Sequence, residues 1–450
     1  MDVTTWSCLE VTPELTDNAA EMDGTGLFGA FWARFSALPQ TPPADRLAAN
    51  LRLIALHEMV VRANPWTAVF VLFTRSRFDL DGAVQLAGIY YLFVVLFEVP
   101  SGWMSDRIGR VPTIRIAAVA WLGSFTCFAV GDDRFGVIVA GQALLAAGYA
   151  CLSGTDVTFH FDTLEALGRA TEYADRQARV VSRGMVVGAT GLLAGGLVGL
   201  VDVRLAFVLS LSLALAQTAI SFRFVEAPHG DRADDIMRQV GTCVGYLRSA
   251  PIAWIFGYGV AMVVLEHVAF EMLQPWLTEA LGRSPNDLGV APLLSGATLA
   301  VMTLVGAAAA RSSAVLGRAL GVRFALVALG ALSACIATLM AASTGLWVLA
   351  LIAFRSVQGA AAPVLISAYV APRIEQRHRA TFLSLDSLAG RLTYGALLLM
   401  LSVDVGDDVS RVLWRLSAVS WTLVALTLLS AMWVRRRHGA AGLDDGRTMQ

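Results

Sequence analysis

The sequence predicts an all-α membrane protein in which twelve helices cross the bilayer as two bundles of six. Three observations predict this fold: 56% of the residues are hydrophobic and only 15% are charged, long apolar runs recur along the chain, and the arginines gather in alternate connecting segments. A water-soluble chain of 450 residues could not cover its surface with so few charges. A helix needs about twenty apolar residues to cross a bilayer, and the recurring runs have that length.

Hydropathy places the membrane helices in two sets that a polar stretch separates. The first six spans are expected at 51–74, 84–104, 113–131, 135–158, 180–201 and 203–225. The other six are expected at 251–277, 287–310, 322–342, 345–370, 381–402 and 410–434. The predicted organisation is a tail (1–49), a first bundle (50–225), a central loop (226–250), a second bundle (251–434) and a short tail (435–450).

The arginines give an independent check on this topology. With the N-terminus inside, about 24 of the 34 basic residues fall in the tails and loops on the inner side, and about six fall in the outer loops. The first 49 residues lack the basic and apolar regions of a secretory signal, so we expect a largely disordered cytoplasmic tail. The pattern predicts a multi-pass protein of a bacterial inner membrane with both termini in the cytoplasm.

Composition and motifs exclude several classes of function. The net charge of −1 gives no indication of nucleic-acid binding, and the five cysteines form no CxxC pair that would suggest a metal site. No Walker loop, dinucleotide fingerprint or nucleophile elbow is present, so we expect neither an enzyme nor a cofactor. Uphill transport by this chain would therefore depend on an ion gradient.

A charged loop after the second predicted helix carries the most specific motif. Residues 102–110 have the pattern G-x-x-x-D-R-x-G-R, in which Gly102 and Gly109 would permit a tight turn between two helices. Asp106 is expected near a helix N-terminus, paired with an arginine, Arg107 or Arg110. Such a charge cluster can stabilise one conformation and release it in another.

This loop resembles the signature of the major facilitator superfamily. Further strings support the resemblance: FEVPSG at 97–102, SGTD at 153–156 with FDTL at 161–164, and RATFLSL at 379–385. The resemblance covers roughly residues 50–434. It implies two helical bundles that work by alternating access, usually with a proton gradient, and it is similar to a bacterial branch associated with efflux of drugs and metabolites.

The resemblance also implies gating residues. Asp156 and Asp162 are expected to meet the arginines of the signature loop, and Glu98 belongs to the same gating region. The chain departs from the family pattern in two places. Val157 and Thr158 stand where relatives commonly have an acidic residue, and the second half, between Gly306 and Gly321, has no aspartate to match Asp106.

Ionisable side chains inside membrane helices are functional candidates, because each costs several kcal/mol unless it is paired or faces water. Glu58 and Arg62 are four residues apart and share a helix face, either as part of a cavity or as an anchor at its mouth. His267 and Glu271 share a face in the same way, whereas Glu266 points elsewhere. Glu58 and Glu266 are the preferred proton carriers, and Glu271 is a further candidate for coupling or substrate binding.

The remaining interior charges are Arg355, Asp386 and Arg391. Asp386 is expected to reach Arg355 on a neighbouring helix and form a buried structural pair. If neither Glu58 nor Glu266 carries the proton, Asp386 is the next candidate for coupling.

Taken together, these features predict a monomeric secondary transporter, surrounded by membrane lipid, that exports a small amphipathic molecule in exchange for protons. Two alternatives remain open. The chain could carry a defined polar or anionic metabolite in either direction, with Arg62, Arg355 and Arg391 binding the negative group, or it could be a membrane sensor that transports nothing.

Overall fold

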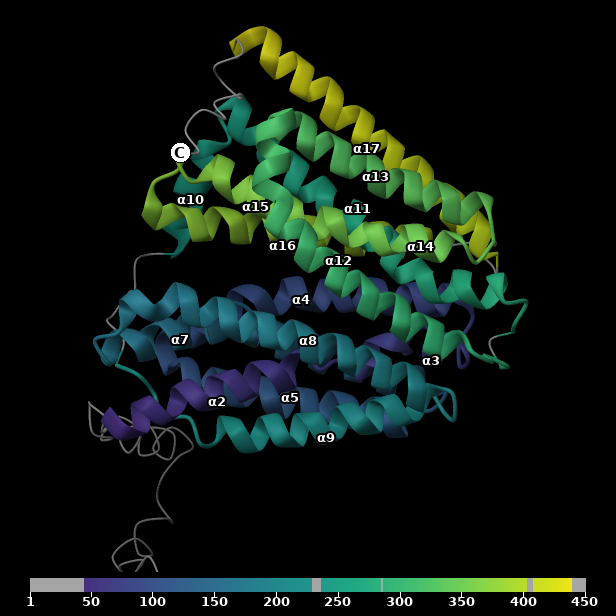
Figure 1. Cartoon of the computed structure of the whole chain (residues 1–450), viewed down its shortest axis with the longest axis horizontal. Helices are drawn as coiled ribbons and strands as arrows, with labels where there is room; N and C mark the ends of the chain where they lie inside the picture. Colours follow the sequence, from purple (N-terminus) through teal and green to yellow (C-terminus); the bar gives the residue numbers. More distant parts are fainter. Residues whose placement is uncertain (1–43, 229–235, 285, 403–407, 439–450) are drawn as a thin grey trace, which may run out of the picture. The chain divides into compact units, whose positions relative to one another are not determined.

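The computed structural model describes residues 44–228, 236–284, 286–402 and 408–438, and most of these residues are helical. The first half contains α2 (Ala44–Arg62), η2 (Pro65–Ala68), α3 (Phe70–Arg75), α4 (Leu80–Ile108), α5 (Arg110–Val130), α6 (Phe135–Leu152), α7 (Thr155–Ala166), η3 (Ala170–Glu172), α8 (Tyr173–Gly199) and α9 (Arg204–Ser221). The second half contains α10 (Ile236–Tyr246), α11 (Ala250–Ala280), α12 (Ala291–Leu320), α13 (Val322–Ala342), α14 (Val348–Ile352), η4 (Ala353–Arg355), α15 (Ser356–Val370), α16 (Gln376–Leu401) and α17 (Val409–His438) (Figure 1). Most of the predicted N-terminal tail and residues 439–450 lie outside the described residues.

Ten helical segments in the described ranges are long and apolar enough to cross a membrane. They account for every predicted span except the first and the eleventh. The first is divided among α2, η2 and α3, and the eleventh is α16; both carry ionisable side chains. Each still packs inside its bundle, α2 against α8 and α9, and α16 against α11. The prediction of an all-α membrane protein with two sets of six helices is therefore confirmed.

Two predicted helices are interrupted, and local chemistry explains both breaks. Asn64 has a non-helical backbone (φ −103°, ψ 70°), and Pro65 starts the 3-10 turn that follows it. The fourth span, expected as one helix over 135–158, ends at Leu152 and resumes at Thr155 because Gly154 adopts φ +77°. Both breaks lie beside the cavity described below.

The segment between the halves contains a helix that hydropathy did not predict. α10 packs against α16, where the Tyr246 hydroxyl lies 3.2 Å from Nδ1 of His378 and Thr381 donates to Oε1 of Gln239 at 3.2 Å. On the other side of the connection, the Asn50 side chain donates to the carbonyl oxygen of Val225 at 2.8 Å. The chain is thus fastened to the first half at Val225 and to the second half at α10.

The two halves pack against each other mainly through two helix pairs, α4 with α16 and α8 with α12 (Figure 1). Gly196 and Gly296 permit the close approach of α8 and α12: a Cβ at Gly196 would lie 3.3 Å from the Cα of Gly296 and 2.6 Å from the carbonyl oxygen of Pro292. A third contact joins Gln274 of α11 to the broken first span. Side chains of both halves therefore border the space between them.

Candidate functional site

A cavity of about 600 Å³ lies between the halves. Its lining is drawn from most of the first-half helices and, in the second half, from α11 and α16. The second-half residues in the lining are His267, Phe270, Glu271, Gln274 and Arg391. At one end the cavity reaches Ser153 and Gly154, which are exposed; at the other it reaches Phe70 and Gln274, which are buried. The volume suits a molecule of drug size.

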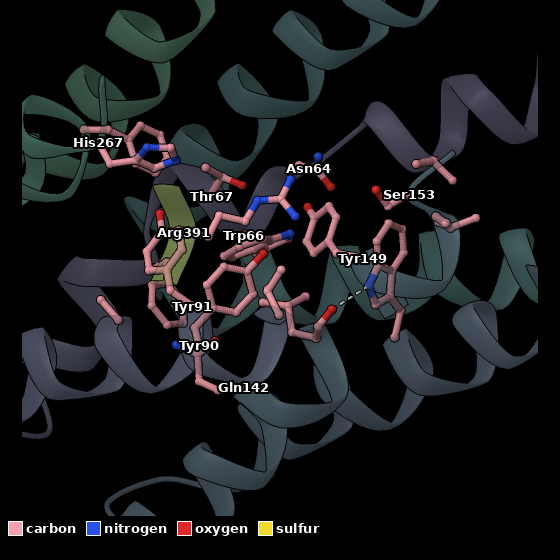
Figure 2. A pocket seen from close by; sticks show the side chains of 18 of the residues that line it. Asn64, Trp66, Thr67, Tyr90, Tyr91, Gln142, Tyr149, Ser153, His267 and Arg391 are labelled. Carbon is pink, nitrogen blue, oxygen red and sulfur yellow. Dashed lines mark hydrogen bonds between the residues drawn. The ribbon is translucent and has the colours of Figure 1, made fainter. Parts of the chain in front are cut away.

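Aromatic rings form much of the wall. They belong to Trp66, Phe70, Tyr90, Tyr91, Trp121, Tyr149 and Phe270. Figure 2 shows Trp66, Tyr90, Tyr91 and Tyr149 around the same space as Arg391. The rings support one another edge to face, as in Tyr90 with Tyr91 (5.2 Å between centroids) and Trp121 with Tyr149 (4.8 Å).

Glu58 and Arg62 form the ion pair that their spacing predicted, and both side chains line the cavity. The Glu58 side chain is buried, whereas that of Arg62 is 40% exposed. Gly184 of α8 makes room for the arginine, because a Cβ there would lie 2.5 Å from its Cδ atom. Asp156 also lines this end of the cavity, and no ion pair joins it to an arginine in the described part of the chain.

The prediction that Asp156 meets the signature loop is therefore wrong in this structure. Asp156 lies in the first turn of α7, where its Oδ1 accepts a hydrogen bond from the backbone N–H of Val157 at 2.7 Å. Because the chain breaks at Gly154, α7 starts at the cavity, and its Asp156 lines the same cavity as Glu58. Asp162, six residues further along α7, is the acid of this pair that meets an arginine of the signature loop.

One face of α11 supplies His267, Glu271 and Gln274 to the cavity, as the four-residue spacing of the first two predicted. Glu271 is buried and accepts a hydrogen bond from the Tyr91 hydroxyl at 3.1 Å. The Tyr91 ring also packs edge to face on His267, with 5.3 Å between centroids. Glu271 thus sits deep in the cavity, and no arginine in the described ranges forms an ion pair with it.

Glu266 lies on a different face of α11, as predicted, and pairs with Arg355 at 3.7 Å. The Arg355 guanidinium also donates to the backbone carbonyl of Glu266 and lies over the Phe270 ring, 5.1 Å from its centroid. The expected pair between Arg355 and Asp386 is therefore wrong. Asp386 is buried against Gly259 of α11, and its Oδ1 has no hydrogen-bond partner in the described part of the chain.

Glu98 and Arg391 come together across the two halves. The Arg391 guanidinium forms an ion pair with Glu98, joining α16 to α4, and Ser153 donates to the other carboxylate oxygen at 3.2 Å. The sequence had suggested Glu98 as a gating residue and Arg391 as a binding residue, without connecting them. Arg391 lines the cavity, so this inter-half pair borders the space available to a substrate.

The signature loop is a helix-to-helix turn built around Arg110. Gly109, at φ +104°, separates the end of α4 from the start of α5. Arg110 is buried and donates to Asp106 Oδ1 at 2.6 Å and to the Ser105 hydroxyl at 2.8 Å, while its Nε lies 3.5 Å from Oδ2 of Asp162. The predicted ion pairs of Asp106 and Asp162 are thereby confirmed.

Three expectations about this loop need correction. Gly102 lies inside α4 with open space beside it, so it makes no turn. Asp106 lies in the last turns of α4, and the carboxylate at the start of α5 belongs to Glu226, whose oxygens accept the N–H groups of Arg110 and Val111 at 2.8 Å each. Arg107 is exposed and lies over the Trp103 ring at 5.6 Å, outside the ion-pair cluster.

In the ranges that the structure describes, no three histidine, cysteine, aspartate or glutamate side chains gather closely enough to hold a metal ion. What the site offers instead is an aromatic chamber with acidic groups at both ends. Sequence reasoning missed Gln274, Tyr91 and Glu226 as functional residues. Each acts through a partner more than 100 positions away, which leaves no local signal.

The comparisons with known proteins agree with this architecture. The chain matches the family model "Major Facilitator Superfamily" over residues 59–394, and no curated protein matches it. Among solved structures, a mutant form of the nucleoside transporter NupG has a TM-score of 0.69 at 12% identity, covering 85% of this chain and 99% of its own. A bacterial homolog of the human lysosomal transporter Spinster, inward-facing and unoccupied, has a TM-score of 0.63 at 16% identity, covering 88% and 98%. A bacterial homologue of the iron transporter ferroportin, also inward-facing, has a TM-score of 0.60 at 14% identity, covering 84% and 98%. At such identities the likeness concerns the fold.

Proposed function

This chain belongs to the major facilitator superfamily of transporters, and from that premise we propose that it exports small aromatic amphipathic compounds, cationic or neutral, in exchange for protons. The observation that carries the proposal is the distribution of charge around the cavity. Asp156 and Glu271 line it without an arginine partner in the described residues, among aromatic rings. Aromatic faces and an unpaired carboxylate both attract an organic cation.

The arginines give little support to the alternative of an anionic substrate. Arg62, Arg355 and Arg391 each already have a carboxylate partner, namely Glu58, Glu266 and Glu98 respectively. An anion would have to displace a glutamate from its arginine, and would leave that glutamate's negative charge uncompensated in a partly buried site. A cation needs no such displacement.

Proton coupling is assigned to Glu271. The sequence favoured Glu58 and Glu266, but each of these already has an arginine as its ion-pair partner. Glu271 faces the cavity and, among the described residues, has only the Tyr91 hydroxyl as a hydrogen-bond partner, so it can hold either a proton or the positive group of a substrate. A carboxylate that binds the two in turn exchanges one for the other.

The direction of transport follows from the proposed orientation in a bacterial inner membrane. The arginine pattern places both termini and the Ser153–Asp156 end of the cavity on the cytoplasmic side. The exposed lining residues lie at this end, which supports an inward-facing state that loads substrate from the cytoplasm. Protons that enter along their gradient then drive the cation outward by alternating access.

Everted membrane vesicles test this function directly. Vesicles that contain the protein should accumulate the fluorescent aromatic cation ethidium when respiration acidifies their lumen, and an uncoupler should release it. Glu271→Gln should reduce this accumulation at least about tenfold, because a neutral amide cannot exchange a proton for a cation. The matched control is Glu279→Gln, on the same helix but exposed and outside the cavity lining.

Two outcomes would contradict the proposal. Accumulation of an aromatic anion such as fluorescein, with none of ethidium, would favour the anionic alternative. Normal accumulation of ethidium by Glu271→Gln would move the coupling site to Glu58, Glu266 or Asp386.

A further inference from the structure

The break in the first membrane span leaves backbone polar groups in need of partners. The first N–H groups of a helix have no acceptor within the helix, and α3 begins at Phe70 without a side-chain cap from Val69. The N–H groups of Val71 and Leu72 belong to this first turn, and the carbonyl of Thr67 lies in the 3-10 turn before it. In a membrane protein such groups must be satisfied by protein or by water in a cavity.

Gln274 of the second half satisfies all three. Its Oε1 accepts the N–H of Val71 at 2.8 Å and that of Leu72 at 3.0 Å, and its Nε2 donates to the Thr67 carbonyl at 2.8 Å. A side-chain amide has the two acceptor lone pairs and the donors that this arrangement requires. Gln274 is buried, so a helix of one half is capped by a side chain from the other half.

This cap lies at the buried end of the cavity. Phe70, Leu72 and Gln274 are buried there, whereas Ser153 and Gly154 at the opposite end are exposed. Gln274 is also three residues from Glu271 on the face of α11 that lines the cavity, and Glu271 reaches the first half through Tyr91. Opening the buried end would have to separate Gln274 from α3.

We propose that Gln274 is the positioning residue that holds this end of the transporter closed. When the halves move apart here, all three hydrogen bonds break and hydrogen bonds to water replace them. The closed state is therefore favoured by the difference in free energy between the bonds to Gln274 and the bonds to water. The inference rests on the alternation between two states that the proposed function requires. It is independent of the substrate and the coupling ion.

Cysteine labelling measures the opening without any transport assay. In a background with all five native cysteines replaced, Phe70→Cys reports on the buried end and Ser153→Cys on the exposed end. The rate of maleimide labelling in lipid nanodiscs, which expose both membrane faces, does not depend on the orientation of the chain. With Gln274→Leu added, labelling at position 70 should become about tenfold faster, a factor that corresponds to ~1.4 kcal/mol.

Gln142→Leu is the matched control. Gln142 is a second buried glutamine in the lining of the same cavity, but its amide donates to the Leu86 carbonyl within the first half, at 3.3 Å. This control should leave labelling at position 70 unchanged. If Gln274→Leu does not reach the membrane, Gln274→Glu decides the question, because it keeps the acceptor for Val71 and Leu72 and replaces the donor to the Thr67 carbonyl by a second acceptor.

The expected order of labelling rates at position 70 is Gln274→Leu, then Gln274→Glu, then the native glutamine. Equal rates in all three, or an equal acceleration by Gln142→Leu, would overturn the assignment. Failure of ethidium transport with the expected labelling order would reject the proposed substrate and leave the role of Gln274 standing.

Discussion

The two halves of the molecule contain the same backbone turn with different side chains around it. Gly109 joins α4 to α5 at φ +104°, and Gly321 joins α12 to α13 at φ +74°. The first turn is surrounded by Arg110, Asp106, Asp162 and Glu226, whereas residues 306–321 contain no acidic residue. Both turns therefore use a glycine at a positive φ, and the acidic residue within the first turn's motif has no counterpart in residues 306–321.

This difference shows where an electrostatic restraint can act. Arg323, the buried arginine that follows the second turn, donates to the backbone carbonyl of Ala431 at 3.4 Å. Arg110 joins α5 to carboxylates of α4 and α7, three separate elements. Relative motion of these elements must break or distort charged contacts in the first half.

The largest effect is expected from Arg110→Ala. It leaves the buried carboxylate of Asp162 without its cation, and breaking a buried pair in this way costs about 3–5 kcal/mol of unfolding free energy. Thermal unfolding of the purified protein, followed by tryptophan fluorescence, should show a clear fall in Tm. Arg107→Ala, which removes an exposed arginine of the same loop, should change Tm little; equal shifts would show that the cluster adds nothing beyond an ordinary surface charge.

A smaller effect is expected from Glu226→Ala. The carboxylate accepts the first two N–H groups of α5, and its loss should cost about 2 kcal/mol, in the range of charge-assisted caps. The same unfolding assay measures it, with Glu165→Ala as the control because that acid is exposed on α7. A Tm equal to that of the control would mean that water replaces the cap without loss.

The smallest effects concern the glycines themselves. Gly109→Ala and Gly321→Ala should each lower the unfolding free energy by about 1 kcal/mol, since both φ values are positive. Gly109→Ala should be the worse, because a Cβ there would lie 2.9 Å from the Glu226 carboxylate. Gly102→Ala, in open space within α4, should be neutral or slightly stabilising. If it lowered the unfolding free energy as much as Gly109→Ala, the loss at Gly109 could not be attributed to the backbone turn.

Hydropathy predicted the fold, with the arginine pattern as an independent check, and it included two spans that fall short of the length and apolarity of the other ten. α16 carries Asp386 and Arg391, and α2 carries Glu58 and Arg62, and the arginine pattern agrees with a crossing at each place. The helix break at Gly154 and the amphipathic α10 were missed, because both are short features inside or beside longer patterns.

For the candidate site, spacing was reliable only within one helix. It predicted the pair of Glu58 with Arg62 and the shared face of His267 and Glu271. It could not predict that Arg355 pairs with Glu266 and not with Asp386, or that Glu98 pairs with Arg391, because these ion pairs depend on how separate helices pack. For the same reason, spacing could not predict the hydrogen bonds of Gln274, whose partners lie about 200 positions away.

The attachment of α10 to α16 has a mechanical consequence. The chain is fastened to the first half up to Val225 and Glu226, and the second-half attachment begins with α10 at Ile236. Ile236 is ten residues after Glu226, and a fully extended chain of this length spans at most ~35 Å. The connection therefore acts as a tether of fixed maximum length, which limits how far the two halves can separate on this side. A substrate too bulky to enter within that limit would be excluded by the length of the chain, whatever its chemistry.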